Sequence, residues 1–406
     1  MPRLLPILIA VVSTLAPCTL EARAQATFQP LGLPTGTTGS GIIALNRDGS
    51  VAVGSLVDNL TYSTFRWTRN GGYIDLLLPP QSWPTAVSDD GAVVAGGSQS
   101  PYASQLVPPF RWTGASGAAL LPVPPNSNAY VRAINGDGSV IVGYVTYNTA
   151  VFPKHAVRWI IGAAGDVTME DLGLPPNGHD AEASGVSSDG TVVVGTATFI
   201  DGVTHAFRWT HESGMMSLGH ASAVLAISSD GAAVMGLDGQ AFRWTSAGGR
   251  QQTSFDTDMG RYQIIAMAAD VPTIVGRRRV GARAYLWNER LGTVDLNEYL
   301  PAHGADIGQW SLTWAEVISA DGRTVAGNDE FFGVYQAWIA TLPQCGSADF
   351  DHDGTPDTDA DIAAFFACIA GNCCPVCGSA DFDADGDTAT DFDIQAFFRV
   401  LGGGSC

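Results

Sequence analysis

Apolar and polar positions alternate over short stretches through most of the chain, and one arrangement of them occurs in seven copies. Each copy has a small residue, an apolar residue and two further residues before an Asp, usually followed by Gly, with another Gly six places after the Asp. Asp-Gly between two apolar stretches is a strong signal of a β-hairpin. The seven Asp residues lie 40 to 52 residues apart: Asp48, Asp90, Asp137, Asp189, Asp230, Asp270 and Asp321.

A second, aromatic element accompanies the first in every copy, and most copies end with a third short element such as Asp75-Leu76-Leu77. The aromatic element reads Phe-Arg-Trp-Thr in four copies, and its tryptophans are Trp67, Trp112, Trp159, Trp209, Trp244, Trp287 and Trp338. Each unit therefore supplies about four short strands. Four strands at this spacing, repeated seven times, predict an all-β, seven-bladed β-propeller over residues 27–343. We expect the tryptophans to pack between blades.

The two ends of the repeat region complement each other. Residues 28–33 match the third element, whereas the last copy stops after its tryptophan strand, near Pro343. The N-terminal strand is therefore expected to complete the seventh blade, which would leave no exposed sheet edges. The alternative, an open β-solenoid, requires capping repeats.

The units resemble HAF repeats, whose name is spelled here by His205-Ala206-Phe207. The resemblance covers about residues 28–343, and the copies at Ala266 and Gln336 depart from the consensus. It implies an exported bacterial protein with a repeat fold. Because the family is defined by positions that support the fold, it implies little about activity.

Residues 345–406 contain a different repeat with an offset of 32 residues. Each copy has Asp at positions 1, 3 and 5 of a loop and Gly at position 6, a pattern whose converging oxygens bind calcium. The last ligand of each loop, at position 13, is expected to be Asp361 in the first loop and Asp393 in the second. Asp359 and Asp391, at position 11, are the alternatives. The predicted ligands of two Ca²⁺ ions are Asp349, Asp351, Asp353, Thr355, Asp361, Asp381, Asp383, Asp385, Asp387 and Asp393.

Two calcium loops, each followed by a short helix with paired phenylalanines, resemble a dockerin module of the Gly/Cys-rich type. The resemblance implies a small EF-hand-like domain that anchors an exported protein to a cohesin-like or other cell-surface partner. The extra residue in each loop and the cysteines depart from the usual dockerin. A disordered acidic tail is the alternative, and the aligned loops and Phe-rich helices argue against it.

Six of the seven cysteines lie in this region: Cys345, Cys368, Cys373, Cys374, Cys377 and Cys406. An even, clustered set in an exported chain predicts disulfides, with zinc binding at Cys374-x-x-Cys377 as the alternative. The 32-residue offset predicts the pairs Cys345–Cys374 and Cys377–Cys406 and leaves Cys368–Cys373, although six cysteines allow 15 connectivities.

Residues 1–24 have the form of a secretory signal peptide: Arg3, an apolar stretch from Leu4 to Ala16, and the small-x-small site Ala22-Arg23-Ala24. The alternatives are a buried N-terminal helix and a lipoprotein signal at Cys18. We expect a secreted or cell-surface protein whose mature chain has no membrane-spanning segment.

The chain carries 40 acidic and 20 basic residues, a net charge of −20, which disfavours nucleic acid as a partner. No nucleotide-binding loop, metalloprotease motif or nucleophile elbow is present. We attribute the repeated Asp residues to turn formation.

The residue seven places before each Asp differs from copy to copy. We expect it to begin the innermost strand of its blade, near one mouth of the propeller's central channel. This position holds Gly41, Trp83, Tyr130, Glu182, Ala223, Gln263 and Trp314. Variation inside a fixed frame indicates function, and aromatic rings beside an acid are typical of sugar and peptide sites. We therefore predict a binding protein with Trp83, Tyr130, Glu182 and Trp314 at the ligand site. The alternatives are a polysaccharide-degrading enzyme, a glycoside hydrolase or polysaccharide lyase, which needs a carboxylate pair, and a structural envelope protein.

Overall fold

The computed structural model describes most of the repeat region and part of the C-terminal region. The described residues are 26–58, 61–79, 82–97, 107–147, 153–199, 202–255, 262–289, 291–343, 350–351, 355, 358–374, 377, 380, 382 and 388–401. Contacts divide the chain into one compact unit of Ala26–Pro343 and a second that includes Gln344–Cys406. The predicted signal peptide lies outside the described residues.

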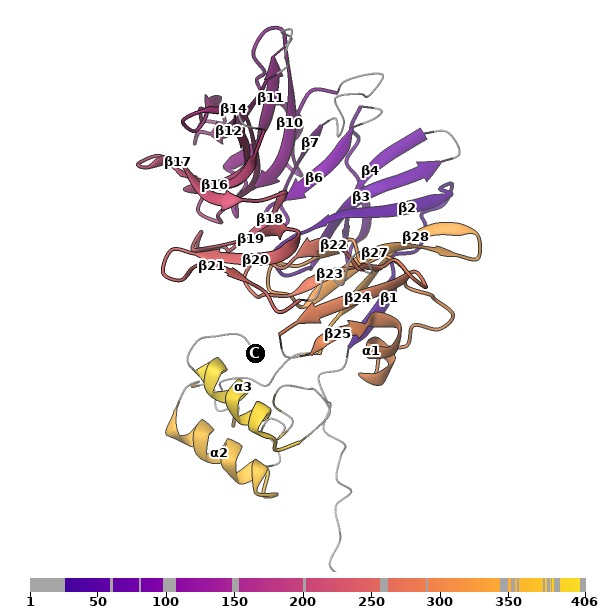
Figure 1. Cartoon of the computed structure of the whole chain (residues 1–406). Coiled ribbons are helices and arrows are strands. Elements are labelled where there is room, and N and C mark those ends of the chain that lie inside the picture. Colours follow the sequence, from indigo (N-terminus) through magenta and orange to yellow (C-terminus); the bar gives the residue numbers. More distant parts are fainter. Residues whose placement is uncertain are drawn as a thin grey trace, which may run out of the picture. The chain divides into compact units, whose positions relative to one another are not determined.

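The first unit consists of seven antiparallel four-stranded sheets, numbered 1 to 7 in chain order, as the repeats predict (Figure 1). Their strands are β2 (Gly39–Leu45), β3 (Val51–Asp58), β4 (Thr61–Thr68) and β5 (Gly72–Asp75) in sheet 1; β6 (Trp83–Val87), β7 (Val93–Gly97), β8 (Phe110–Thr113) and β9 (Gly117–Leu120) in sheet 2; β10 (Ser127–Ile134), β11 (Val140–Tyr147), β12 (Lys154–Ile161) and β13 (Val167–Asp171) in sheet 3; β14 (Gly178–Val186), β15 (Val192–Phe199), β16 (Thr204–Thr210) and β17 (Gly214–His220) in sheet 4; β18 (Ala223–Ile227), β19 (Ala233–Asp238), β20 (Gln240–Thr245) and β21 (Gly249–Gln252) in sheet 5; β22 (Tyr262–Met267), β23 (Ile274–Arg278), β24 (Arg283–Asn288) and β25 (Gly292–Asp295) in sheet 6; and β26 (Val317–Ile318), β27 (Thr324–Phe331), β28 (Val334–Thr341) and β1 (Thr27–Pro30) in sheet 7.

The first strand of each sheet contacts the first strand of the next, from β2 through β26 and back to β2. This is the arrangement of a seven-bladed β-propeller in which these seven strands are innermost. The outer strand of sheet 7 is β1, which pairs with β28 so that Thr27 lies opposite Thr341 and Pro30 opposite Trp338. The connection between sheets 6 and 7 also contains a short helix, α1 (Leu296–Ala302).

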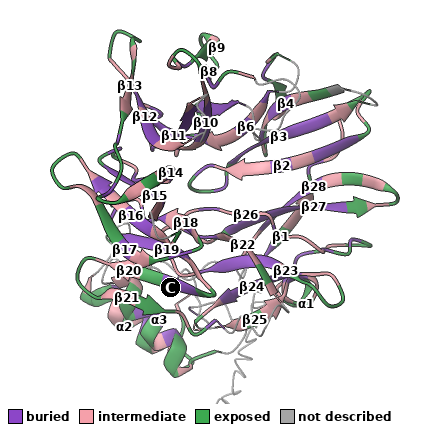
Figure 2. Ribbon diagram, turned by 45° about the horizontal axis from the view of Figure 1, so that its top comes forward, coloured by how far each residue is buried: buried purple, intermediate pink, exposed green. Residues whose placement is uncertain are grey.

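The repeated tryptophans join neighbouring sheets, as predicted. Trp67, for example, belongs to an apolar cluster with Ala326 and Ala337 of sheet 7, and Trp209 to one with Val142 of sheet 3. Buried residues are most frequent in the second strands, such as β11, in which seven of eight residues are buried, whereas three of the four residues of the outer strand β9 are exposed (Figure 2). The core is thus divided among the seams between neighbouring sheets.

A β-bulge interrupts the innermost strand at the same place in six sheets, five residues before the repeated Asp. The bulge brings the carbonyl oxygen seven residues before the Asp against the Gly six residues after it. A Cβ on Gly143 would lie 1.9 Å from the Tyr130 oxygen, and the other six glycines would place theirs 1.9–2.5 Å from the matching oxygen. Close backbone approach therefore explains the repeated Gly.

The repeated Asp forms its turn, as predicted. In sheet 4 the Asp189 carboxylate accepts hydrogen bonds from the Thr191 N–H (3.0 Å) and the Ser187 hydroxyl (2.6 Å), and five other sheets repeat the contact with the N–H two residues on. These contacts reproduce the backbone hydrogen bonding of a turn. Asp270 is the exception, and its carboxylate bonds to Ser229 of sheet 5 instead.

The second unit contains two helices, α2 (Asp359–Ile369) and α3 (Asp391–Leu401). Its core is formed by two pairs of fully buried phenylalanines that are related by the 32-residue offset, Phe350 with Phe382 and Phe365 with Phe397. The Phe365 and Phe397 rings stack with centroids 4.0 Å apart.

The described disulfides are Cys368–Cys373 and Cys374–Cys377. The first was predicted. The predicted pairs Cys345–Cys374 and Cys377–Cys406 are wrong, because Cys374 bonds to Cys377. The two residues share a tight turn, with a 3.2 Å hydrogen bond between the Cys377 N–H and the Cys374 oxygen and a Cα–Cα distance of 5.2 Å. This distance suits a disulfide. The local turn, and not the 32-residue repeat, therefore determines which cysteine bonds to Cys374.

Candidate functional site

The central channel of the propeller has two ends. We call the end with the Asp turns the turn end, and the opposite end, where the inner strands begin, the loop end. Function in a repeat fold lies where side chains vary and where the fold does not already use them. The two ends differ in this respect.

At the turn end, a closed circle of hydrogen bonds links every sheet to the next. Five of the seven links join two backbone groups, and the other two use the Asn46 amide and the Asp270 carboxylate. In the first link, Asn46 Nδ2 donates to the backbone oxygen of Asp89. In the other six links a backbone N–H donates, and the pairs from donor to acceptor are Asp89 to Gly136 O, Gly136 to Ser188 O, Ser188 to Ser229 O, Ser229 to Asp270 Oδ1, Asp270 to Ala320 O and Ala320 to Arg47 O. The hydrogen-bonding groups of these turns therefore hold neighbouring sheets of the ring together.

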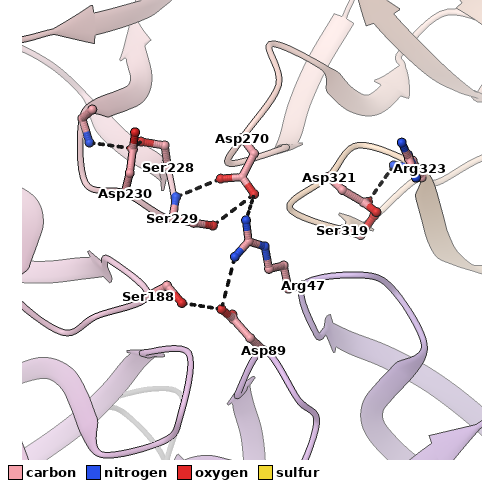
Figure 3. A network of polar contacts seen from close by, with 11 residues as sticks. Arg47, Asp89, Ser188, Ser228, Ser229, Asp230, Asp270, Ser319, Asp321 and Arg323 are labelled. Atoms are coloured by element: carbon pink, nitrogen blue, oxygen red, sulfur yellow. Dashed lines mark hydrogen bonds and ion pairs between the residues drawn. The ribbon is translucent and has the colours of Figure 1, made fainter. Parts of the chain in front are cut away.

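Side chains also cross the channel at the turn end (Figure 3). The Arg47 guanidinium lies 3.0 Å from the Asp270 carboxylate and 3.8 Å from that of Asp89, which accepts a 2.6 Å hydrogen bond from Ser188. Each acid thus has a partner of opposite charge or a hydroxyl donor. The described groups here satisfy one another, which favours a structural role.

At the loop end, each sheet has two variable positions beside the seams between neighbouring sheets. One is the residue seven places before the repeated Asp, and the other lies seven places after it. In six sheets the two face each other on adjacent strands, as the pairs Gly41/Ser55, Trp83/Gly97, Tyr130/Tyr144, Glu182/Thr196, Ala223/Leu237 and Gln263/Arg277, and sheet 7 has Trp314 and Asn328 at these positions.

Two of these seams carry partly exposed tryptophans. The Trp314 ring lies under the Arg277 guanidinium, 4.2 Å from ring centroid to Cζ. The Trp83 ring lies 5.2 Å from that of Tyr62, which is 50% exposed. Both therefore present aromatic surface at the loop end.

The other two predicted site residues have different surroundings. Glu182 is bound by the Arg132 Nε at 2.7 Å and by Lys154 Nζ at 2.9 Å. Tyr130 is only 1% exposed and stacks on Tyr144 at 4.8 Å. It lines a cavity of about 180 Å³ between sheets 2 and 3, and burial raises the pKa of its hydroxyl to about 12. The structure thus places the four residues at one register without bringing them into one cluster.

The seam between sheets 7 and 1 lies between the two tryptophan seams and carries Gly41. A Cβ on Gly41 would lie 3.7 Å from Ser55 Oγ and 3.9 Å from Asn328 Oδ1, which are ordinary contacts. The Asn328 amide exchanges hydrogen bonds with the backbone of Ile42. Tyr335, beside this seam on β28, is 51% exposed. The repeat position that holds a tryptophan in each flanking seam thus holds Gly41 here, with polar groups beside it.

Two carboxyl groups lie behind this seam. Burial raises the pKa of Glu316, a hydrogen bond from Asn328 partly offsets this, and the nearby Asp329 raises it further. Asp329 is buried, and burial raises its pKa although it accepts hydrogen bonds from the Thr313 N–H, the Thr313 hydroxyl and the Trp338 indole (2.9 Å). Asp329 is therefore held by the protein, and Glu316 is the acid that faces the seam.

Most predicted calcium ligands, namely Asp349, Asp353, Asp381, Asp383, Asp385 and Asp387, lie outside the described residues, as do Cys345 and Cys406. Asp361 and Asp393 are buried at the starts of α2 and α3. One oxygen of Asp361 accepts from Phe350 N–H and the other from Thr358, and Asp393 repeats this with Phe382 and Thr390. Asp359 and Asp391, the alternative closing ligands, are exposed. Among the described residues, no group of three potential ligands gathers around one point.

Comparisons with known proteins support the fold. No model of a protein family and no curated sequence matches this chain. Among solved structures, an oligogalacturonate lyase in complex with manganese is similar over 78% of this chain and 93% of its own, with 12% identity and a TM-score of 0.53. A virginiamycin B lyase from Staphylococcus aureus is similar over 78% of this chain and all of its own, with 14% identity and a TM-score of 0.47. At 12% identity, the likeness to the oligogalacturonate lyase shows the fold alone.

A basic hairpin beside this site was not predicted from the sequence. Arg277, Arg278, Arg279 and Arg283 lie within seven residues of one another around the turn between β23 and β24. A count of charges along the chain would have found them, because the chain has only 20 basic residues and a net charge of −20.

Proposed function

We propose that this chain is an exported binding protein whose propeller recognises a glycan or a protein at the loop end. The observation that supports it best is the pair of partly exposed tryptophans, Trp314 and Trp83, on either side of the polar Gly41 seam. Aromatic faces with a few fixed polar groups are typical of carbohydrate and peptide sites. The turn end offers no comparable surface among the described residues.

A polysaccharide-degrading enzyme is the alternative that Glu316 and Asp329 favour, because two carboxyl groups are the machinery of glycoside hydrolysis. However, Asp329 is buried and accepts hydrogen bonds from Thr313 and Trp338. Glu182, the acid that the sequence suggests, is bound by Arg132 and Lys154. One available acid supports binding better than hydrolysis.

The C-terminal unit is proposed to bind two Ca²⁺ ions and to anchor the protein to a cell-surface partner. Because both oxygens of Asp361 and of Asp393 already accept hydrogen bonds from the chain, Asp359 and Asp391 suit the closing position better. None of the described helices is long and apolar enough to cross a membrane.

The test is retention of the full chain on a panel of immobilised polysaccharides, beside a variant that carries Trp83→Ala and Trp314→Ala. Loss of retention in the variant, with an unchanged thermal midpoint, would support a carbohydrate site at the loop end. Equal retention of both forms would contradict it. No retention of either form would contradict the glycan hypothesis and leave proteins as ligands.

A further inference from the structure

We propose that the ligand is a polyanionic carbohydrate, a chain of sugars with carboxylate or sulfate groups. In this proposal it crosses the Gly41 seam and its charges lie at the β23–β24 hairpin. The proposal rests on the proposed function, because it assigns a chemical class to the ligand of the same site.

The first argument is the concentration of positive charge. Four arginines lie on one hairpin of a chain with a net charge of −20, next to the Trp314 seam. Arg278 and Arg279 are exposed, and Arg277 lies over Trp314 with a buried Nε that has no hydrogen-bond partner in the described part of the chain. Planar guanidinium groups are suited to carboxylates and sulfates, because their paired N–H donors match two oxygens.

The second argument is that this charge has a structural cost. Arg278 lies directly opposite Arg283 in the β23–β24 ladder. Like charges at directly opposite positions destabilise a hairpin. The Asp295 carboxylate lies 3.9 Å from Arg283, and no ion-pair partner of Arg278 is found among the described residues. A repulsive pair at an exposed hairpin is explained if a bound anion lies there.

The third argument concerns Gly41. A Cβ here makes only ordinary contacts, and the backbone does not adopt the left-handed conformation that favours glycine. Folding therefore does not demand glycine at this position, whereas the equivalent position is Trp314 on one side and Trp83 on the other. The missing side chain leaves only the backbone of Gly41 between Ser55 and Asn328, in the seam between the two aromatic seams.

The acids beside the seam do not oppose this arrangement strongly. Asp329 is buried and held by its own donors, and burial favours the neutral form of Glu316. Glu330 and Asp58, two further acids at the loop end, are exposed. The arginines of the hairpin therefore present the more accessible charge.

The experiment measures binding of the full chain to alginate, dextran sulfate and uncharged dextran, at low and at high salt. Two test variants are Gly41→Gln and the double variant Arg278→Gln/Arg279→Gln. Their matched controls are Ala223→Gln, at the same repeat position in sheet 5, and Arg69→Gln/Arg323→Gln, which removes two charges at the turn end. Glutamine suits the repeat position because Gln263 occupies it in sheet 6.

The proposal predicts binding to both polyanions and none to dextran, with affinity that falls as salt screens the charges. Each test variant should lose about tenfold or more in affinity and each control less than about twofold. The single variant Arg278→Gln should bind more weakly while its thermal midpoint stays equal or rises, because it removes the repulsion with Arg283. A merely structural arginine would not separate these two readouts.

Equal loss in the test variants and their controls would overturn the proposal. So would retention of polyanion binding in Gly41→Gln. Binding of an uncharged glycan that depends on Trp83 and Trp314, with no binding of polyanions, would refute the charge assignment and leave the proposed function intact. Failure of every carbohydrate to bind would overturn this proposal and the glycan form of the proposed function, and would leave a protein as the ligand.

Discussion

Replacing the repeated glycine of one sheet tests the packing argument at a defined point. In Gly143→Ala the new methyl carbon would lie 1.9 Å from the Tyr130 oxygen and 2.9 Å from its carbonyl carbon. Contacts under 3.0 Å do not occur, so the two strands must separate by about 1 Å, which is 3.0 minus 1.9. Such a shift pulls on the β10–β11 ladder and on the bulge between Val131 and Ala133.

The expected cost is about 1–3 kcal/mol, the usual penalty of inserting a carbon into a filled site. Alanine also restricts the unfolded chain, which returns about 0.4–1 kcal/mol. Gly114→Ala is the matched control, because its Cβ would lie 3.9 Å from the nearest atom, Trp112, and its backbone is not left-handed. We therefore expect a destabilised Gly143→Ala and an unchanged or slightly stabilised Gly114→Ala.

Tryptophan fluorescence during urea unfolding measures this difference. All ten tryptophans lie between Trp67 and Trp338, so the signal reports on the propeller and not on the C-terminal unit. A Gly143→Ala variant as stable as Gly114→Ala would refute the claim that close backbone approach requires glycine at this repeat position.

The remaining predictions concern charge. Hydrogen bonds from Ser88, Ser187 and Ser228 lower the pKa of Asp90, Asp189 and Asp230, so their contribution to stability is present above an ordinary Asp pKa of about 4 and is lost as the pH falls below it; a flat urea midpoint between pH 6 and pH 3 would contradict this. Burial raises the pKa of Glu316, so its ionisation destabilises the fold as the pH rises above 4.5. The urea midpoint of Glu316→Gln should therefore be higher than that of the parent protein at pH 7 and no higher at pH 4. Arg47→Gln should cost under about 1 kcal/mol, less at high salt, because the ion pairs are partly exposed and the circle of hydrogen bonds uses the Arg47 backbone oxygen, not its side chain; a larger, salt-independent loss would mean that the Arg47 side chain holds the ring. Calorimetry should find two Ca²⁺ ions per chain and one in Asp353→Ala, whereas no calcium uptake by the parent chain would contradict the calcium proposal.

The sequence predicts the architecture well because the repeat carries its own physical signals. The Asp-Gly turn, the tryptophan strand and the seven copies each predict what the structure contains. Sheet 6 shows where the pattern weakens: Val271 replaces the turn glycine, and Asp270 turns its carboxylate to Ser229. The bulge was not predicted, although its consequence, an unvarying glycine, is visible in every copy.

The site was harder to predict, because it depends on contacts between residues far apart in the chain. The repeat position of Trp83 and Trp314 is evident from the sequence, but the burial of Tyr130 under Tyr144 and the capture of Glu182 by Arg132 depend on neighbouring strands and sheets. The disulfide prediction failed for a related reason, since the local turn at Cys374 outweighs the repeat symmetry.

The central claim is that the loop end of sheets 6, 7, 1 and 2 binds the ligand. Hydrogen–deuterium exchange of the full chain, with and without saturating alginate, tests it most directly. We predict new protection in residues 39–43, 277–283 and 312–316. Protection confined to the turn-end residues 47–50 and 88–92, or to the helices of the C-terminal unit, would contradict the account.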